Sequence, residues 1–406
     1  MKAVFISFAF PPQNAPRAVQ VARLATFSAL PIRVVCAGTS DNGFQPRPGV
    51  DVVRFPDTSS SWWRLVKRFI YLPDSERPWA DQLARSILSQ RLIDTDDVLI
   101  TFGQPMSDHL AGLALKRALN IPWIAHFSDP WSDNPYGWPN PLSRLRLRTM
   151  EQNVIAAADR VLFTSQETVD LVMGKYPPAW RAKAGAMPHT FDPHGLAGET
   201  RSAGTGATFV LRHLGNFYGR RNPLLLIQAL KLLLQKQPAM LDGVHFELIG
   251  RWVGHDKPSS TAFGLPDGLV RFRKSIPYID SLREMRDASA LLIIDAPFEH
   301  NVFFPSKLVD YLWARRPILA LTPPGTTANI VGDAGGAIVS PQTPESIAAG
   351  LVDFLARLRS GQIGLPREDI ISRYDARLVA REFDELVISL SRHAVPGEAR
   401  LREVAP

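Results

Sequence analysis

The sequence predicts an α/β protein made of two parallel-sheet units in tandem. Short apolar runs rich in β-branched residues alternate with longer amphipathic stretches along most of the chain, which is typical of parallel strands covered by helices on both faces. The chain has 406 residues, of which 45% are hydrophobic, so it is too long for one ordinary domain and too apolar to be disordered. A stretch rich in glycine, threonine, serine and alanine divides the alternation into two sets.

The first set predicts a doubly wound domain within residues 1–195. Its helices include Arg17–Leu30, whose apolar side chains recur at a period of about 3.6 residues, and Glu151–Ala158, which leads into the last strand. The strands of this domain are expected at Ala3–Ser7, Arg33–Ala37, Val52–Phe55, Val98–Thr101, Trp123–Phe127 and Arg160–Thr164.

The second set predicts another Rossmann-like unit within residues 208–372, after the connecting stretch Asp192–Thr208. The last segment, 373–406, contains a long helical pattern at Ala376–His393. Parallel sheets bind ligands outside the carboxyl ends of their strands, so a cleft between two facing units is the expected site. The elements of the second unit are expected at Phe209–Leu214, His245–Ile249, Leu291–Ile294, Ile318–Leu321 and Ala337–Val339 for strands, and at Pro223–Leu234, Ser306–Ala314 and Pro344–Arg359 for helices.

The net charge of +7 does not indicate nucleic-acid binding, because it is spread evenly. Residues 1–200 hold 21 Lys and Arg against 18 Asp and Glu, an excess of three, and residues 201–406 hold 25 against 21, an excess of four. No helix-turn-helix, RNP or zinc-finger pattern accompanies this charge. A single cysteine, Cys36, excludes a disulfide framework and a thiolate zinc site, which fits a reducing cytoplasm.

Two short segments combine basic and apolar residues in a way that favours contact with phosphates at a membrane surface. In the first, Trp62 and Trp63 precede three cations, and in the second three arginines alternate with leucines before Met150. The alternative is that the tryptophans pack on the first domain or line a ligand cleft. No uncharged run reaches the roughly 18 residues that a membrane-spanning helix needs, so any attachment is expected to be peripheral. The cations are Arg64, Lys67 and Arg68 in the first segment and Arg144, Arg146 and Arg148 in the second.

The segment FEHNVFFPSKLVDYLWARRPIL, residues 298–319, indicates a phosphate-binding helix start. Ser306 is placed to cap a helix that carries Lys307 in its first turn and Asp310 one turn later, on the same face. A lysine at a helix N-terminus neutralises phosphate oxygens together with the backbone N–H groups. The carboxylate of Asp310 is an acceptor for a vicinal diol such as a ribose. The alternative is a solvated Lys–Asp pair on the surface.

The segment HLGNFYGRRNP, residues 213–223, indicates a second phosphate-binding element. An apolar strand ends at Gly215, a short loop carries Arg220 and Arg221, and Pro223 opens a helix. Glycine permits close backbone approach and arginine offers a planar fork to phosphate. The alternative is a loop with solvated arginines.

These two segments resemble the nucleotide-binding half of the retaining GT-B glycosyltransferases of glycosyltransferase family 4. The resemblance implies that Gly215 and Arg221 bind the donor diphosphate, that Asp310 holds the ribose hydroxyls, and that Lys307 lies near the phosphates. Three further residues of the same segments are expected in the donor site: Asn216, Arg220 and Ser306.

Three segments of the first half are similar to the same family and occur in its order: FAFPPQNAPRAVQVARLATFSAL, IPWIAHFSDPWSDNP and EQNVIAAADRVLFTSQETVDLV. The resemblance covers roughly residues 1–360. It implies the GT-B fold, in which two Rossmann-like domains face a central cleft and a C-terminal helix crosses back to pack on the first domain.

The sequence departs from the family pattern at three places. The opening loop lacks the usual glycines, and Arg17 is expected to substitute for them by charge in the donor site. The first acid of the family's acid pair falls on Val302, so that Glu299, with His300 beside it, is the nearest acid for the donor. The usual Asn-Gly after the "AD.V" unit is His189-Thr190.

The resemblance also implies how the reaction runs. Retaining enzymes of this type use front-face departure and attack without a side-chain nucleophile, so the protein must stabilise the leaving diphosphate and align the substrates. Arg221 and Lys307 are the candidates for charge stabilisation, and His126 is the candidate residue near the reacting sugar, although a structural role for this histidine is the alternative. Asp129 and Trp131 are expected on the acceptor side, with bracing of their loop as the alternative for Asp129.

The sequence carries no D-x-D metal motif in the expected place, so metal independence and the absence of any cofactor are predicted. Asp129 and Asp133 are separated by three residues in a loop, and the acids at Asp94–Asp97 are typical of a turn between a helix and a strand. The string Gly332–Gly336 follows a predicted helix rather than opening one, which favours a turn over a phosphate cradle.

The sequence therefore predicts a cytoplasmic glycosyltransferase, with the inner face of the cell membrane as a candidate location. It would move a sugar from a nucleoside-diphosphate donor to a glycan or lipid-linked acceptor, with retention, in surface-polysaccharide biosynthesis. Two alternatives stay open. A sugar-nucleotide epimerase shares the architecture but needs acid and base carboxylates, and a catalytically silent binding subunit is favoured by Val302.

Overall fold

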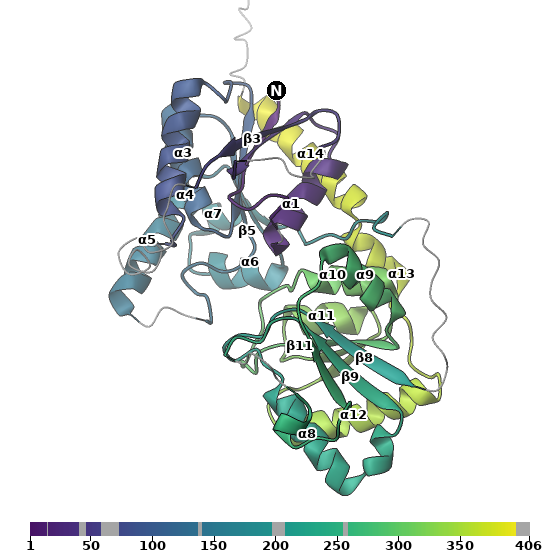
Figure 1. Cartoon of the computed structure of the whole chain (residues 1–406). Coiled ribbons are helices and arrows are strands. Elements are labelled where there is room, and N and C mark those ends of the chain that lie inside the picture. Colours follow the sequence, from purple (N-terminus) through teal and green to yellow (C-terminus); the bar gives the residue numbers. More distant parts are fainter. Residues whose placement is uncertain are drawn as a thin grey trace, which may run out of the picture. The chain divides into compact units, whose positions relative to one another are not determined.

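Figure 1 shows the computed structural model of the chain, which describes residues 1–13, 15–39, 46–57, 73–136, 140–196, 208–254 and 259–394. The chain divides into two compact units. Unit 1 comprises Met1–Thr164, Thr168–Met187 and the chain from Val379 onward, and unit 2 comprises Ser165–Glu167 and Pro188–Leu378. None of the helices within the described ranges is long and apolar enough to cross a membrane.

Unit 1 contains a seven-stranded parallel sheet in the order β3-β2-β1-β4-β5-β6-β7. The order reverses between β1 and β4, which is the point where a doubly wound sheet opens a crevice at its carboxyl edge. The strands are β1 (Ala3–Ile6), β2 (Ile32–Ala37), β3 (Val50–Phe55), β4 (Val98–Gly103), β5 (Trp123–Phe127), β6 (Arg160–Phe163) and β7 (Ala184–Ala186).

Helices cover both faces of this sheet because successive strand residues point to opposite sides. Val4 and Ile6 join the core beneath α3, α4 and α5, whereas Ala3 and Phe5 join the core beneath α1 and α14. The helices are α1 (Pro16–Phe27), α3 (Arg77–Gln90), α4 (Ser107–Leu119), α5 (Pro141–Ala157), α6 (Gln166–Met173), α7 (Pro178–Arg181) and α14 (Ala376–Ala394).

The C-terminal helix α14 belongs to the core of unit 1, as predicted. Phe383 meets the ring of Phe5 edge-on at a centroid distance of 5.7 Å. Asp384 accepts hydrogen bonds from the Ser28 hydroxyl at 2.6 Å and from the Ala29 amide at 2.7 Å, just after α1 ends. The helix is thus fixed by both apolar burial and a buried carboxylate.

Unit 2 contains a six-stranded parallel sheet in the order β10-β9-β8-β11-β12-β13. Its strands are β8 (Phe209–Leu214), β9 (Val244–Ile249), β10 (Val270–Arg273), β11 (Ala290–Ile294), β12 (Ile318–Leu321) and β13 (Ala337–Val339). Its helices are α8 (Leu224–Lys236), α9 (Tyr278–Asp287), α10 (Lys307–Ala314), α11 (Thr326–Asp333), α12 (Pro344–Arg359) and α13 (Glu368–Ile371). The apolar faces of α8 and α12 share one core, and those of α9, α10, α11 and α13 share another.

Each predicted strand occurs within two residues of its expected bounds, and the Gly332–Gly336 string lies where α11 ends, as a turn. The predicted helix Glu151–Ala158 is too short, because α5 begins at Pro141 and includes the basic segment. Residues 197–207 of the connecting stretch and residues 58–72, with Trp62 and Trp63, lie outside the described residues.

Candidate functional site

The carboxyl ends of β8 and β11 lie side by side in unit 2, where the strand order reverses. Gly215, directly after β8, has a φ of +141°, which favours glycine. A Cβ atom on Gly250, which follows β9, would lie 2.1 Å from the Gly215 carbonyl oxygen. The loops after β8 and β9 therefore approach each other so closely that only glycine fits at position 250. A Cβ on Gly215 itself would lie 3.0 Å from the Lys307 Nζ atom, which places the lysine head at this strand end.

Lys307 is held by a neutral histidine. Its Nζ atom lies 2.9 Å from Nε2 of His213, whose Nδ1 lies 3.0 Å from the Leu292 carbonyl oxygen. A carbonyl only accepts, so Nδ1 carries the ring proton and Nε2 accepts from the lysine. Burial first, and then the charge of Lys307, lower the pKa of His213 well below its usual value.

The pKa of Lys307 is lowered to near neutral pH. Burial and repulsion by Arg221 lower the pKa of Lys307 to about 7, against the opposing attraction of Asp295. An anion bound beside Lys307 would raise this pKa again, because a nearby negative charge favours the ammonium form.

Arg221 is aimed by a buried acid. Its Nη2 atom donates to Oδ1 of Asp295 at 3.0 Å, and Asp295 follows β11 directly and is 3% exposed. The same carboxylate accepts from Nδ2 of Asn301 at 2.8 Å and from the Thr322 hydroxyl at 2.9 Å. These bonds fix the acid, and the acid fixes the arginine beside Lys307.

Asp310 lies inside unit 2 and is 6% exposed. It accepts a hydrogen bond from the Tyr278 hydroxyl of α9 at 3.0 Å. The next residue, Tyr311, accepts from the Leu214 amide at 2.8 Å and donates to the Leu292 carbonyl at 3.3 Å, so α10 is bonded to the end of β8 and to the middle of β11. The alternative of a solvated Lys–Asp pair does not fit this burial.

The other residues expected in the donor site have different surroundings. Ser306 makes no capping hydrogen bond, because its own backbone is helical and only an extended residue directs its side chain at the helix N–H groups. Arg220 donates to the Pro297 carbonyl at 2.8 Å and lies over the Phe298 ring at 4.9 Å. Asn216 accepts from the Arg251 amide at 2.9 Å. Glu299 is exposed.

In unit 1, Arg17 and His126 lie together in the interior. The Arg17 Nη1 atom lies 3.2 Å from His126 Nδ1, and its Nη2 atom donates to the Gly103 carbonyl. Burial, and then the charge of Arg17, lower the pKa of His126 to about 3, so the ring is neutral and accepts from the arginine. His126 therefore positions Arg17 at the carboxyl edge of the sheet. Burial lowers the pKa of Arg17 to about 10, which leaves it cationic at neutral pH.

A pocket of about 460 Å³ lies in the loops at the carboxyl ends of unit 1 strands. Trp131, expected on the acceptor side, lines it, is 4% exposed, and its indole Nε1 has no hydrogen-bond partner among the described residues. Asp74 and Glu76, from the segment between β3 and α3, also line it. Gln13, Gln104, Met106 and Asn134 also line the pocket.

The loop that carries Asp129 and Trp131 is braced from α5. Glu151 is fully buried and accepts from the Ser132 amide at 2.9 Å and from the Tyr176 hydroxyl at 2.7 Å. The Lys175 ammonium lies 2.6 Å from the same carboxylate. The glutamate that opens the segment EQNVIAAADRVLFTSQETVDLV thus shapes the loop after β5.

Several of these residues were not predicted from the sequence. Asp295 had a usable signal, because an acid follows a buried strand directly, and His213 is a polar residue inside an apolar strand. Glu151 opens the family-like segment EQNVIAAADRVLFTSQETVDLV, but its bracing role was not predicted. Tyr278 and Asp74 had no signal, since their partners lie far away in the sequence.

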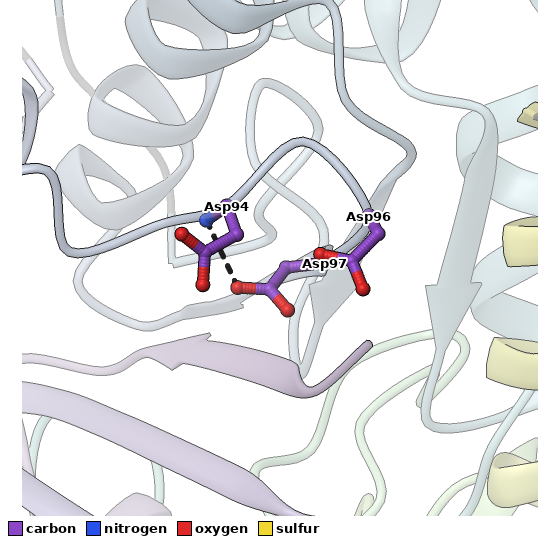
Figure 2. A group of neighbouring side chains, drawn as sticks. All are labelled: Asp94, Asp96 and Asp97. Atoms are coloured by element: carbon purple, nitrogen blue, oxygen red, sulfur yellow. Dashed lines mark hydrogen bonds between the residues drawn. The ribbon is translucent and has the colours of Figure 1, made fainter.

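Within the described ranges, one group of acids could hold a metal ion by its geometry: Asp94, Asp96 and Asp97, which Figure 2 shows on one turn. Asp97 already accepts from the Lys2 amide at 2.8 Å and from the Asp94 amide at 3.0 Å. The turn precedes β4, so it lies at the amino edge of the sheet, and its acids fasten the backbone there, as expected for a helix-to-strand turn.

Residues 17–184 match the family model described as a glycosyl transferase 4-like domain. No curated protein sequence matches the chain.

Three solved structures illustrate the likeness of the whole chain. Sucrose-phosphate synthase from Thermosynechococcus elongatus has a TM-score of 0.73 at 14% identity, and the match covers 97% of this chain and 99% of that one. The E. coli trehalose-6-phosphate structure bound with UDP-2-fluoro glucose has a TM-score of 0.67 at 13% identity, with 97% and 99% covered. The α,α-trehalose-phosphate synthase from Burkholderia xenovorans, in complex with glucose-6-phosphate, has a TM-score of 0.64 at 14% identity, with 95% and 100% covered.

Identities this low show the fold and not the substrates. The two parallel-sheet units and these structures together show that the chain has the GT-B fold, and residues 17–184 match the glycosyl transferase 4-like model.

Proposed function

We propose that the chain transfers a sugar from a nucleoside-diphosphate donor to a glycan or lipid-linked acceptor, with retention and without a metal ion. The observation that carries this proposal is the cationic end of β8 in unit 2. Lys307 lies beside the glycine Gly215 and contacts His213, Arg221 is bonded to Asp295, and Asp310 lies one turn along α10.

This arrangement suits a leaving diphosphate. Two cations held by fixed partners need no reorganisation when negative charge develops, which is the condition for electrostatic stabilisation of a transition state. They would also supply the charge that a metal ion supplies in other transferases, which supports metal independence. Asp310 offers a carboxylate to the ribose, and the family resemblance supports retention.

The UDP complexes among the structural neighbours make UDP-sugars the first donors to test. A ligand present at 100 times its dissociation constant stabilises a protein by about 2.7 kcal/mol, so a thermal-shift panel of UDP-, GDP-, ADP- and dTDP-sugars would identify the donor. Release of free nucleoside diphosphate with acceptor glycans, in the presence of EDTA, then tests transfer. Retention is checked by the anomeric configuration of the product in an NMR spectrum.

The same assay separates the alternatives. An epimerase would change the sugar of the donor, whereas a silent binding subunit would be stabilised by a donor without releasing diphosphate. The silent subunit is the second candidate because Val302 stands where the family carries an acid. Donor binding without turnover under all acceptor conditions would overturn the transferase proposal.

A further inference from the structure

The pocket of unit 1 combines an apolar wall with acidic charge. Among the described lining residues, the charged ones are Asp74 and Glu76, both acidic. Trp131 and Met106 lie on the apolar wall, and the side-chain amides of Gln13, Gln104 and Asn134 offer donors and acceptors. Aromatic and apolar walls with a few polar groups are typical of pockets that bind small polar molecules such as sugars.

The helix N-terminus that could attract a phosphate near this pocket is already bonded to a carboxylate. Helix α4 begins at Ser107, and a helix N-terminus attracts anions through its free N–H groups and its dipole. Here Asp74 accepts from the Ser107 amide at 3.1 Å and from the Ser107 hydroxyl. Asp108 adds a second, buried carboxyl group in the first turn, bonded to the Phe8 amide at 2.8 Å.

A phosphate that entered the pocket would therefore meet Asp74 and Glu76 instead of a helix end. Burial raises the pKa of Asp74 to about 6, with a contribution from nearby Glu76, so Asp74 is still ionised above neutral pH. Like charges disfavour binding, whereas a carboxylate accepts hydrogen bonds readily from sugar hydroxyls and from an ammonium group.

We infer that this pocket binds a glycosyl acceptor group without phosphate or carboxylate, and that Asp74 and Glu76 exclude sugar phosphates from it. The inference rests on the proposed transfer reaction, because it names the acceptor that the reaction would use. It distinguishes this chain from the structural neighbour that was solved with glucose-6-phosphate.

The test uses direct binding by the full chain, without donor, so that it fails independently of the proposed reaction. Glucosamine and glucose 6-phosphate share a ring and differ in charge, and both are titrated at pH 8 and low salt by ligand-observed NMR. We expect glucosamine to bind at least about ten-fold more tightly, which corresponds to roughly 1.4 kcal/mol. In Asp74→Asn/Glu76→Gln this preference should fall to less than about two-fold, through tighter binding of glucose 6-phosphate.

Two controls keep the result interpretable. Asn keeps the acceptor oxygen that caps α4, and Glu76→Gln alone, which leaves that cap untouched, should already reduce the preference if the double variant does not fold. The matched charge control is Glu345→Gln/Asp353→Asn on α12 of unit 2, which should keep the wild-type preference. Equal or tighter binding of glucose 6-phosphate to the wild type, an unchanged preference in the pocket variants, or no binding of either sugar would each overturn the inference.

Discussion

Asp310 is buried beside Tyr278, so its carboxylate faces a fixed direction before any ligand arrives. We expect Asp310→Ala to lower donor affinity on the order of 10-fold to 150-fold, because a hydrogen bond to a charged group contributes roughly 1.5–3 kcal/mol. Isothermal titration calorimetry with the donor identified by thermal shift measures the change. Tyr278→Phe keeps the carboxylate and should have a smaller effect. Unchanged donor affinity in Asp310→Ala would show that α10 does not hold the ribose.

Arg221 and Lys307 are proposed to stabilise the leaving diphosphate more than the bound donor. If so, Arg221→Gln/Lys307→Gln should lower turnover at saturating donor by about 100-fold or more, beyond its effect on affinity. Steady-state kinetics with a separate donor titration distinguishes the two effects. Arg220→Gln is the comparison, since its guanidinium is directed to the Pro297 carbonyl. If the double variant bound the donor more weakly but kept its turnover at saturating donor, the two cations would contribute to donor binding and not to the transition state.

The low pKa of Lys307 predicts how donor binding depends on pH. The diphosphate binds the ammonium form, so affinity should be highest below pH 7 and fall by up to about ten-fold per unit as the pH rises from 7 to 9. Stability has the opposite sign, because a folded pKa below the unfolded value makes the folded chain gain stability as the pH rises above 7. Affinity titrations at several pH values measure the effect. Lys307→Arg should make donor affinity independent of pH between 7 and 9, because arginine stays charged in this range. A donor affinity of the wild type that does not change with pH would contradict the prediction.

At the scale of elements, Glu151 joins α5 to the loop after β5. Glu151→Ala leaves the Ser132 amide, the Tyr176 hydroxyl and the Lys175 ammonium without this acceptor, and breaking a buried ion pair costs about 3–5 kcal/mol. We expect a clear drop in the melting temperature of unit 1, measured by calorimetry. The exposed neighbour Gln152→Ala is the control and should melt like the wild type. A melting temperature unchanged by Glu151→Ala would mean that the loop does not depend on this brace.

The sequence predicted the strands well because each is a short apolar run that packs on both faces. It missed β7, whose Ala-Gly-Ala has no β-branched residue, and β10, where arginines alternate with Val270 and Phe272 at the sheet edge. The helix predicted before the Gly332–Gly336 string is α11, although two threonines and Gly332 weaken its helical pattern.

The candidate site was predictable only where its residues are neighbours in the chain. Lys307 and Asp310 share one helix turn, and Gly215 and Arg221 share one loop, so local spacing placed them in two segments. The partners that aim them come from elsewhere: His213 lies 94 residues before Lys307, and Asp295 lies 74 residues after Arg221. Periodicity carries no information about such pairs, because they depend on which strands are adjacent.

At the scale of the whole molecule, the sequence-based proposal of a peripheral membrane contact remains. Helix α5 supports it, since Leu142 and Leu145 are 56% and 62% exposed beside the arginines of the second basic segment. Each Lys or Arg near an anionic surface contributes about 1 kcal/mol, so binding should be reversible and lost at high salt. Flotation with anionic liposomes tests this. Two triple variants are compared with the wild type. In the first, glutamine replaces Arg64, Lys67 and Arg68, and in the second it replaces Arg144, Arg146 and Arg148.

Either variant should float less than the wild type. A triple variant of exposed cations in unit 2 controls for overall charge and should float normally: Lys274→Gln, Arg359→Gln and Arg373→Gln. If the wild type did not float at low salt, or if the control variant lost flotation to the same extent, the proposed membrane contact would be wrong.

The placement of α14 has a consequence for the order in which the protein can be completed during synthesis. Strand β1 and helix α1 leave the ribosome before unit 2 and α14, yet the apolar face they share is covered by Ala380, Phe383 and Val387. The nascent first unit therefore keeps an open apolar face while all of unit 2 is being translated. A truncated first half, or a chimera whose second half replaces α14, would leave that face exposed to solvent. Any exchange of halves between two such proteins should therefore keep α14 together with unit 1.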